Sequence, residues 1–90
     1  MSYFVYIIQS GKDNSYYKGF TENPALRLLQ HNAGSSAYTS SKVPWRLVYL
    51  EIFLDKRSAL QREKAIKKYG HEHIMRLILS PKNIADKLSQ

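Results

Sequence analysis

Residues 3–21 consist of YFVYIIQ (3–9), SGKDNS (10–15) and YYKGFT (16–21), and these segments indicate the fold more clearly than any other part of the chain. Residues 3–9 are aromatic, β-branched and almost continuously apolar, which is typical of a strand in the interior of a sheet. Residues 10–15 carry turn chemistry throughout. Residues 16–21 have the composition of a second strand, so the stretch predicts a β-hairpin.

A helix follows the hairpin. Asn23 supplies a cap and Pro24 a first residue with preset φ, so the helix is expected over residues 24–33 and to end at Gly34. The apolar stripe expected to be buried has the spacing i, i+3 and i+7 and consists of Leu26, Leu29 and Ala33.

The second half of the chain adds one strand and two helices. Residues 34–44 are expected to form a loop of small side chains, and residues 45–54 a third, long strand. Asp55 and Ser58 are candidate caps for the next helix, in which residues 58–61 fit a capping box.

That helix is expected to run to Tyr69 and to end at Gly70. A shorter helix is predicted over residues 72–79, and its apolar face consists of Ile74, Leu77 and Ile78. The polar tail, residues 82–90, is expected to be frayed, although Ile84 and Leu88 could dock a last turn.

Size and composition bound the class of protein. Ninety residues make one domain, placed at residues 1–80 with a C-terminal tail at 81–90. Cysteine is absent, which excludes disulfides and cysteine nucleophiles and fits the cytoplasm. The longest apolar run, residues 3–8, is far shorter than the ~20 residues that span a bilayer, so a soluble protein without a membrane partner is expected.

The chain is strongly basic. Its net charge is +7 and its pI is near 9.8, which predicts a polyanionic partner. Residues 56–76 hold seven basic side chains against only Glu63 and Glu72. A solvated, lysine-rich helix face is the alternative explanation of this local surplus.

Two tyrosines of the hairpin are candidate functional residues. If Gln9 pairs with Tyr16, then Tyr6 lies opposite Gly19 and Tyr17 is its diagonal neighbour on the same face. The glycine would then leave room between the backbone and a ligand. A register slip of one residue would separate the two phenols, and the alternative role for each is an aromatic core residue.

Arg27 and His31 are spaced i, i+4 on the first helix and therefore share one face. A helical wheel places them opposite the predicted buried stripe, so they are expected to point away from the core. A pair that binds phosphate and a pair that is merely exposed would both lie there.

Glu63 falls in an apolar stripe of its helix. The residues expected to define that stripe are Ala59, Leu60 and Ile66. A carboxylate in such a position loses hydration and must be paired, protonated or bound to a metal, for which its oxygen chemistry favours Mg²⁺ or Mn²⁺. The alternative is an i, i+4 ion pair with Lys67.

Other sites find no support in the sequence. His71 and His73 are spaced i, i+2, which on a helix turns them apart and excludes joint chelation of zinc. Neither of the glycine-rich phosphate-binding loop patterns is present.

In order and spacing these residues resemble the GIY-YIG nuclease superfamily. The positions that carry the resemblance are Phe4-Val5-Tyr6, Tyr17-Lys18-Gly19, Arg27, His31 and Glu63. More narrowly, the chain resembles the small stand-alone bacterial branch, related to the N-terminal nuclease domain of the bacterial excision-repair nuclease. Three further segments match that branch: HNAG (31–34), AYTSSKVPWRLVY (37–49) and SALQREKAIKKY (58–69).

The resemblance covers about residues 3–79 and has two departures. Phe4 stands at the first signature glycine, and Lys18 at the isoleucine of the second triplet. Lys18 is expected to point to the face opposite Tyr17.

The resemblance implies an α/β (α+β) fold in which helices flank a three-stranded antiparallel sheet. It also implies a metal-dependent endonuclease that hydrolyses DNA phosphodiester bonds, with branched or damaged DNA and a role in DNA repair or processing among the expectations. Two alternatives stay open. One is a catalytically weak or inactive nucleic-acid-binding module, and the other is a protein-interaction domain whose charge serves only solubility.

The resemblance also assigns roles within the site. Glu63 would bind one divalent cation, Mg²⁺ or Mn²⁺, and Tyr17, aided by Tyr6, would take a proton from the attacking water. Arg27 would stabilise charge on the phosphoryl oxygens, and His31 would contact the phosphate or assist proton transfer. Further substrate contacts are predicted at Gly19, Tyr38, Lys42, Lys64 and Lys67.

Overall fold

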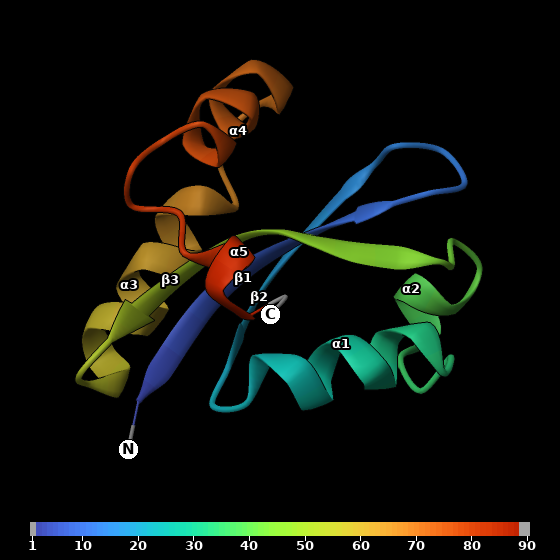
Figure 1. Ribbon diagram of the computed structural model, residues 1–90, viewed down its shortest axis with the longest axis horizontal. Coiled ribbons are helices and arrows are strands. Elements are labelled where there is room, and N and C mark those ends of the chain that lie inside the picture. The colour runs from blue at the N-terminus through green and yellow to red at the C-terminus, as the bar shows by residue number, and fades with distance from the viewer. Residues whose placement is uncertain (1, 89–90) are drawn as a thin grey trace.

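The computed structural model describes residues 2–88, and it has the predicted α+β architecture of a small sheet flanked by helices (Figure 1). The strands are β1 (Tyr3–Ser10), β2 (Tyr16–Thr21) and β3 (Trp45–Phe53). The helices are α1 (Pro24–Asn32), α2 (Ala37–Ser40), α3 (Lys56–Ile66), α4 (His71–Ile78) and α5 (Ala85–Leu88). No helix within residues 2–88 combines the length and the apolar character needed to cross a membrane.

The sheet is antiparallel with the strand order β2-β1-β3, so β1 is its central strand. The interior position predicted for residues 3–9 is therefore confirmed. The predicted hairpin register is also confirmed, because Gln9 pairs with Tyr16 and Tyr6 with Gly19. β2 pairs on one side only, so its outer edge is free to border a site.

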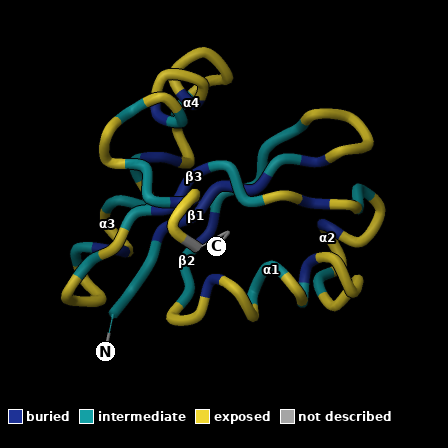
Figure 2. Tube along the Cα trace, viewed as in Figure 1, coloured by how far each residue is buried: buried dark blue, intermediate teal, exposed yellow. Residues whose placement is uncertain are grey.

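Alternation along the strands divides the core between the two faces of the sheet. On one face Val5, Ile7 and Tyr49 pack with the apolar residues of α3 and α4. On the other face Tyr6 and Ile8 pack with residues of β3, α1 and α5. Figure 2 shows the buried residues concentrated along the strands, with exposed stretches on the helices and loops.

The predicted orientation of α1 is wrong. Leu26 is 49% exposed and Leu29 67% exposed, and Ala33 is also exposed, whereas His31 is fully buried. Leu28 packs against the sheet instead. The helix has leucines on several sides, so apolar spacing alone did not fix its inward face.

The start of α3 agrees with one of the two caps predicted for it. Asp55, not Ser58, is the N-cap, and its carboxylate accepts hydrogen bonds from the Ser58 amide (2.8 Å) and hydroxyl (2.9 Å). The predicted capping box is therefore wrong. Leu60, expected in the buried stripe, is 40% exposed, although Ala59 and Ile66 are fully buried as expected. The helix ends at Ile66, earlier than predicted.

The tail is held on the domain by Asn83. Its side-chain oxygen accepts from the amides of Leu50 (3.1 Å) and Ala85 (2.9 Å), and its nitrogen donates to the carbonyls of Val48 and Ile78 (both 2.9 Å). Ile84 joins the core as anticipated, so the expectation of fraying is wrong for residues 83–85. The side chain of Leu88 lies outside the described residues.

Candidate active site

The Tyr6 ring forms the floor of the candidate site. It lies across Gly19 on the neighbouring strand, so closely that a Cβ there would stand 2.5 Å from Tyr6 Cζ. Only a residue without a side chain allows this approach. Tyr17 lies diagonally beside it on the same face, with ring centroids 6.4 Å apart.

His31 fixes the Tyr6 hydroxyl from α1. The Tyr6 oxygen lies 2.9 Å from His31 Nε2, and His31 Nδ1 lies 2.8 Å from Thr39 Oγ1 on α2. Both ring nitrogens therefore have partners, which offsets the cost of burying the imidazole completely. Burial, followed by the charge of Arg27, lowers the pKa of His31 and favours its neutral form.

This arrangement changes the role expected of His31. A side chain with no exposed surface and two occupied nitrogens is not available for direct contact with a phosphate. It is instead a positioning residue that acts through Tyr6.

The segment predicted as a loop contains α2, which supplies Thr39. Thr39 is fully buried, and its carbonyl accepts a hydrogen bond from Trp45 Nε1 (2.9 Å). The end of α1 is tied to the same place, because the Asn32 side chain bonds the amide (2.6 Å) and the carbonyl (3.0 Å) of Trp45. Thr39 has no signal in the sequence, since its role depends on how this segment folds back onto His31.

Arg27 influences Tyr6 from α1, one turn before His31. It lowers the pKa of Tyr6 through a side-chain hydrogen bond and through its charge, yet desolvation by burial is the larger effect and raises that pKa to about 12. The guanidinium also donates to Gln30 Oε1 (3.1 Å). Arg27 thus lies at the site and is not confined to solvent.

A shallow hollow of about 320 Å³ opens beside Tyr17. It is lined by Tyr16, Tyr17, Lys18, Tyr38 and Lys67. Residues 16–18 are consecutive on β2 and point to alternate faces, so the hollow lies at the free edge of that strand. We call it the edge cleft.

Glu63 approaches this cleft from α3, which packs on the opposite face of the sheet from α1. Its side chain is 18% exposed and lies 3.5 Å from Lys67 Nζ, so the i, i+4 pair raised as an alternative is present. Its charge nevertheless raises the pKa of Tyr6, which places the carboxylate within electrostatic reach of the phenol. Lys67 itself lines the edge cleft, so its partner Glu63 lies beside that cleft.

The predicted substrate contacts lie in different places. Gly19 is buried beneath the Tyr6 ring, so that ring takes the room that was expected for a ligand. Tyr38 and Lys67 line the edge cleft, and Tyr38 is 64% exposed with its ring 5.8 Å from that of Tyr17. Lys42 stands 5.8 Å over the Tyr38 ring and pairs with Asp13 at 3.3 Å. Lys64 lies elsewhere, in a hollow on the outer face of α3.

The donor set fits a weakly ligated hard cation. Within residues 2–88 no three His, Asp or Glu side chains gather into a metal-binding group. Mg²⁺ needs only one or two protein carboxylates, because waters and substrate phosphate fill its other positions. Glu63 suits that role once its ion pair with Lys67 is broken. The Lys67 side chain is more than half exposed, so it can move away.

A model of the GIY-YIG catalytic domain matches residues 2–73. The chain belongs to the GIY-YIG family. Its relatives include UPF0213 protein SH2523 of Staphylococcus haemolyticus, 42% identical over 77 residues that cover 84% of this chain and 93% of that protein. UPF0213 protein CPE1444 of Clostridium perfringens is 44% identical over 78 residues, 86% of this chain and 83% of that protein.

A solved structure supports the fold. The NMR structure of UPF0213 protein BH0048 from Bacillus halodurans is similar with a TM-score of 0.60 and 28% identity, over 99% of this chain and 95% of that one. Lys18, a departure from the GIY-YIG signature, points to the face opposite Tyr17, as predicted. Lys18 donates to the Tyr69 carbonyl (3.0 Å) on the α3 side of the sheet, while also bordering the edge cleft.

Proposed function

We propose that this GIY-YIG protein is a metal-dependent endonuclease that hydrolyses DNA phosphodiester bonds at the edge cleft. One observation carries the proposal: Tyr6 lies among four polar side chains that come from the three elements β2, α1 and α3. They are Tyr17, Arg27, His31 and Glu63. A binding module has no need to gather a carboxylate beside these groups, because a carboxylate repels a polyanion.

Tyr17 is the better candidate for the proton acceptor. Burial raises the pKa of Tyr6 to about 12, and its hydroxyl is engaged by His31, so Tyr6 is poorly suited to lose a proton. Tyr17 is half-buried and borders the edge cleft, where a water could approach it. The rings of Tyr6 and His31 both contact the Tyr17 ring, so they would hold Tyr17 in place at the cleft.

Arg27 would stabilise the charge that develops on the phosphoryl oxygens. Its planar donor fork suits this role, and removal of one such donor commonly costs about 10²–10³ in rate. Lys67 would neutralise substrate charge at the mouth of the cleft.

Glu63 would hold the divalent cation, Mg²⁺ or Mn²⁺. When bound, such a cation supplies polarisation of the scissile phosphate and stabilisation of the leaving oxygen. With Glu63 engaged in this way, Lys67 would lose its ion-pair partner and would be free to contact phosphate.

The test is cleavage of plasmid, nicked, branched and single-stranded DNA in Mg²⁺, with EDTA as the metal-free arm. Wild type is compared with Glu63→Ala and Tyr17→Phe. The matched controls are Glu72→Ala, which removes an exposed carboxylate of α4, and Tyr3→Phe, whose ring stacks on Phe20 away from the cleft. We expect cleavage by wild type and both controls and a loss of about 10²-fold or more in both site variants.

The same assay separates the alternative. Salt-sensitive binding without strand scission by wild type would favour a catalytically inactive nucleic-acid-binding module. Equal cleavage by all variants would point to a contaminating nuclease. A role in DNA repair would require a preference for damaged or branched substrates in the same panel.

A further inference from the structure

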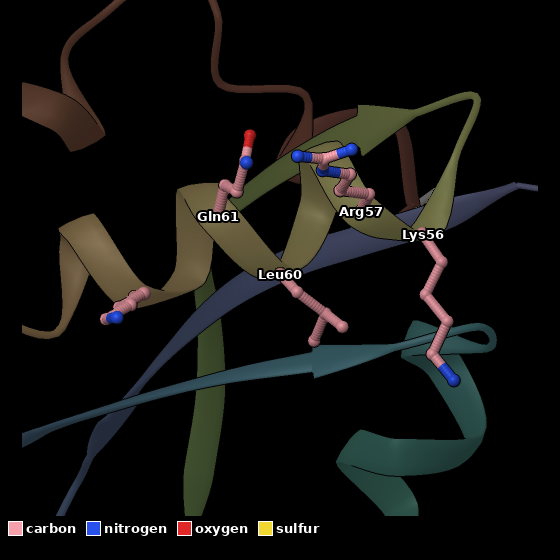
Figure 3. A pocket seen from close by; sticks show the side chains of 5 residues that line it. Lys56, Arg57, Leu60 and Gln61 are labelled. Carbon is pink, nitrogen blue, oxygen red and sulfur yellow. The ribbon is translucent and has the colours of Figure 1, made fainter.

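The outer face of α3 carries a second hollow, separate from the edge cleft. It has a volume of about 510 Å³ and is lined by Lys56, Arg57, Leu60, Gln61 and Lys64. These residues are spaced i, i+1, i+4, i+5 and i+8, so they form two adjacent ridges of one helix face. Figure 3 shows Arg57 and Gln61 leaving α3 on one side, and Lys56 and Leu60 on the other. We call this surface the α3 outer face.

The cations of the α3 outer face are available to a partner. Lys56, Arg57 and Lys64 are exposed, and none of them takes part in a salt bridge within residues 2–88. Two other basic residues of this segment differ, because Arg62 pairs with Glu51 at 3.0 Å and Lys67 with Glu63 at 3.5 Å. The unpaired cations therefore lie on the exposed face of the helix, where a polyanion can reach them.

The spacing of the charges suits a phosphate backbone. Lys64 lies eight positions after Lys56, a rise of about 12 Å along the helix, which is comparable to the width of the major groove of B-DNA. Leu60 lies between them and is 40% exposed, so the surface offers an apolar contact flanked by positive charge. Gln61 adds a side chain that can bond to phosphate or sugar oxygens.

The α3 outer face also adjoins the edge cleft. Lys67 is one helical turn beyond Lys64 and lines the cleft itself. A strand that follows this row of lysines would therefore pass from the α3 outer face toward Glu63 on the same helix.

We infer that the α3 outer face binds the phosphate backbone of duplex DNA next to the bond held in the edge cleft. The inference rests on the proposed function for its choice of DNA. The surface orients the duplex relative to Glu63 without reading its sequence, and Lys64 belongs to this surface and not to the cleft.

The test is binding of a short fluorescein-labelled duplex in EDTA, measured by fluorescence anisotropy at a series of KCl concentrations. The variant is Lys56→Ala/Arg57→Ala/Lys64→Ala. Its matched control is Arg76→Ala/Lys82→Ala/Lys87→Ala, which removes the same charge from exposed positions on α4, on α5 and in the segment between them. Each lost phosphate contact should reduce the slope of log K against log salt by about 1, so the variant should lose about 3 and the control less than about 1.

Equal slopes for the two triple variants would overturn the inference, because charge would then act without regard to its position. A change in self-association by sedimentation, with unchanged DNA binding, would also overturn it by assigning the surface to protein contact. If the triple variant unfolds by circular dichroism, Lys56→Gln and Lys64→Gln should each lower the slope by about 1. Binding is measured without metal, so this test does not depend on catalysis. A wild type that fails to cleave DNA would refute the proposed nuclease, but the test of the α3 outer face would still be valid.

Discussion

Gly19→Ala tests the closest approach in the site. A Cβ at this position would lie 2.5 Å from Cζ and 2.8 Å from Cε1 of Tyr6. The ring has little freedom to yield, because it is 3% exposed and its hydroxyl is held by His31. Such overpacking typically costs about 1–3 kcal/mol, and for a domain of this size about 2 kcal/mol lowers Tm by roughly 8–16 °C.

Thermal unfolding followed by circular dichroism and by Trp45 fluorescence measures this effect, since Trp45 packs in the same cluster as Tyr6. Gly70→Ala is the matched control. A Cβ there meets nothing within 4 Å, although the loss of a glycine cap could cost up to about 1 kcal/mol. A Gly19→Ala protein as stable as the control, with unchanged cleavage of DNA, would refute the proposed packing of the Tyr6 ring against Gly19.

Of three further predictions, two concern the hydrogen bonds of His31 beside the Tyr6 ring, and the third concerns the C-terminal tail. Thr39→Val should lower the free energy of unfolding in urea by about 1–3 kcal/mol, because it leaves His31 Nδ1 buried without a partner. Thr39→Ser should retain most of the stability. Equal losses in the two variants would exclude the hydrogen bond as the cause. The pKa of His31 is lowered in the folded state, so the free energy of unfolding should keep its full value above the unfolded pKa of about 6.5 and should fall as the pH drops toward the folded pKa. His31→Gln should flatten this dependence of stability on pH between about pH 7 and 5. Asn83→Ala should cost about 2–3 kcal/mol by removing the hydrogen bonds that join the tail to β3, and proteolysis should then cut near residue 83.

The strand register could be predicted because local rules determine it. The turn at residues 10–15 brings Gln9 opposite Tyr16, and that pairing also places Tyr6 against Gly19 and beside Tyr17.

The orientation of α1 could not be predicted in the same way. Leu26, Leu28 and Leu29 give the helix apolar residues on several sides, and a buried histidine is acceptable only where distant residues bond both its nitrogens. The sequence gives no sign that Thr39 does so.

Helical spacing predicts that Glu63 is shielded from solvent, but the relation of its carboxylate to Tyr6 is tertiary. Its helix covers the face of the sheet opposite α1, and the carboxylate acts on Tyr6 where the edge strand β2 ends the sheet. Helical periodicity contains no information about that approach.

The most direct test of the site is a double-mutant cycle on single-turnover cleavage of DNA in Mg²⁺, with wild type, Glu63→Gln, Tyr17→Phe and the double variant. If the two side chains act on one phosphate as a unit, each single variant should lose about 10²-fold or more and the double variant little beyond that. Losses that multiply in the double variant would show that the carboxylate and the phenol work independently, which would contradict a shared site.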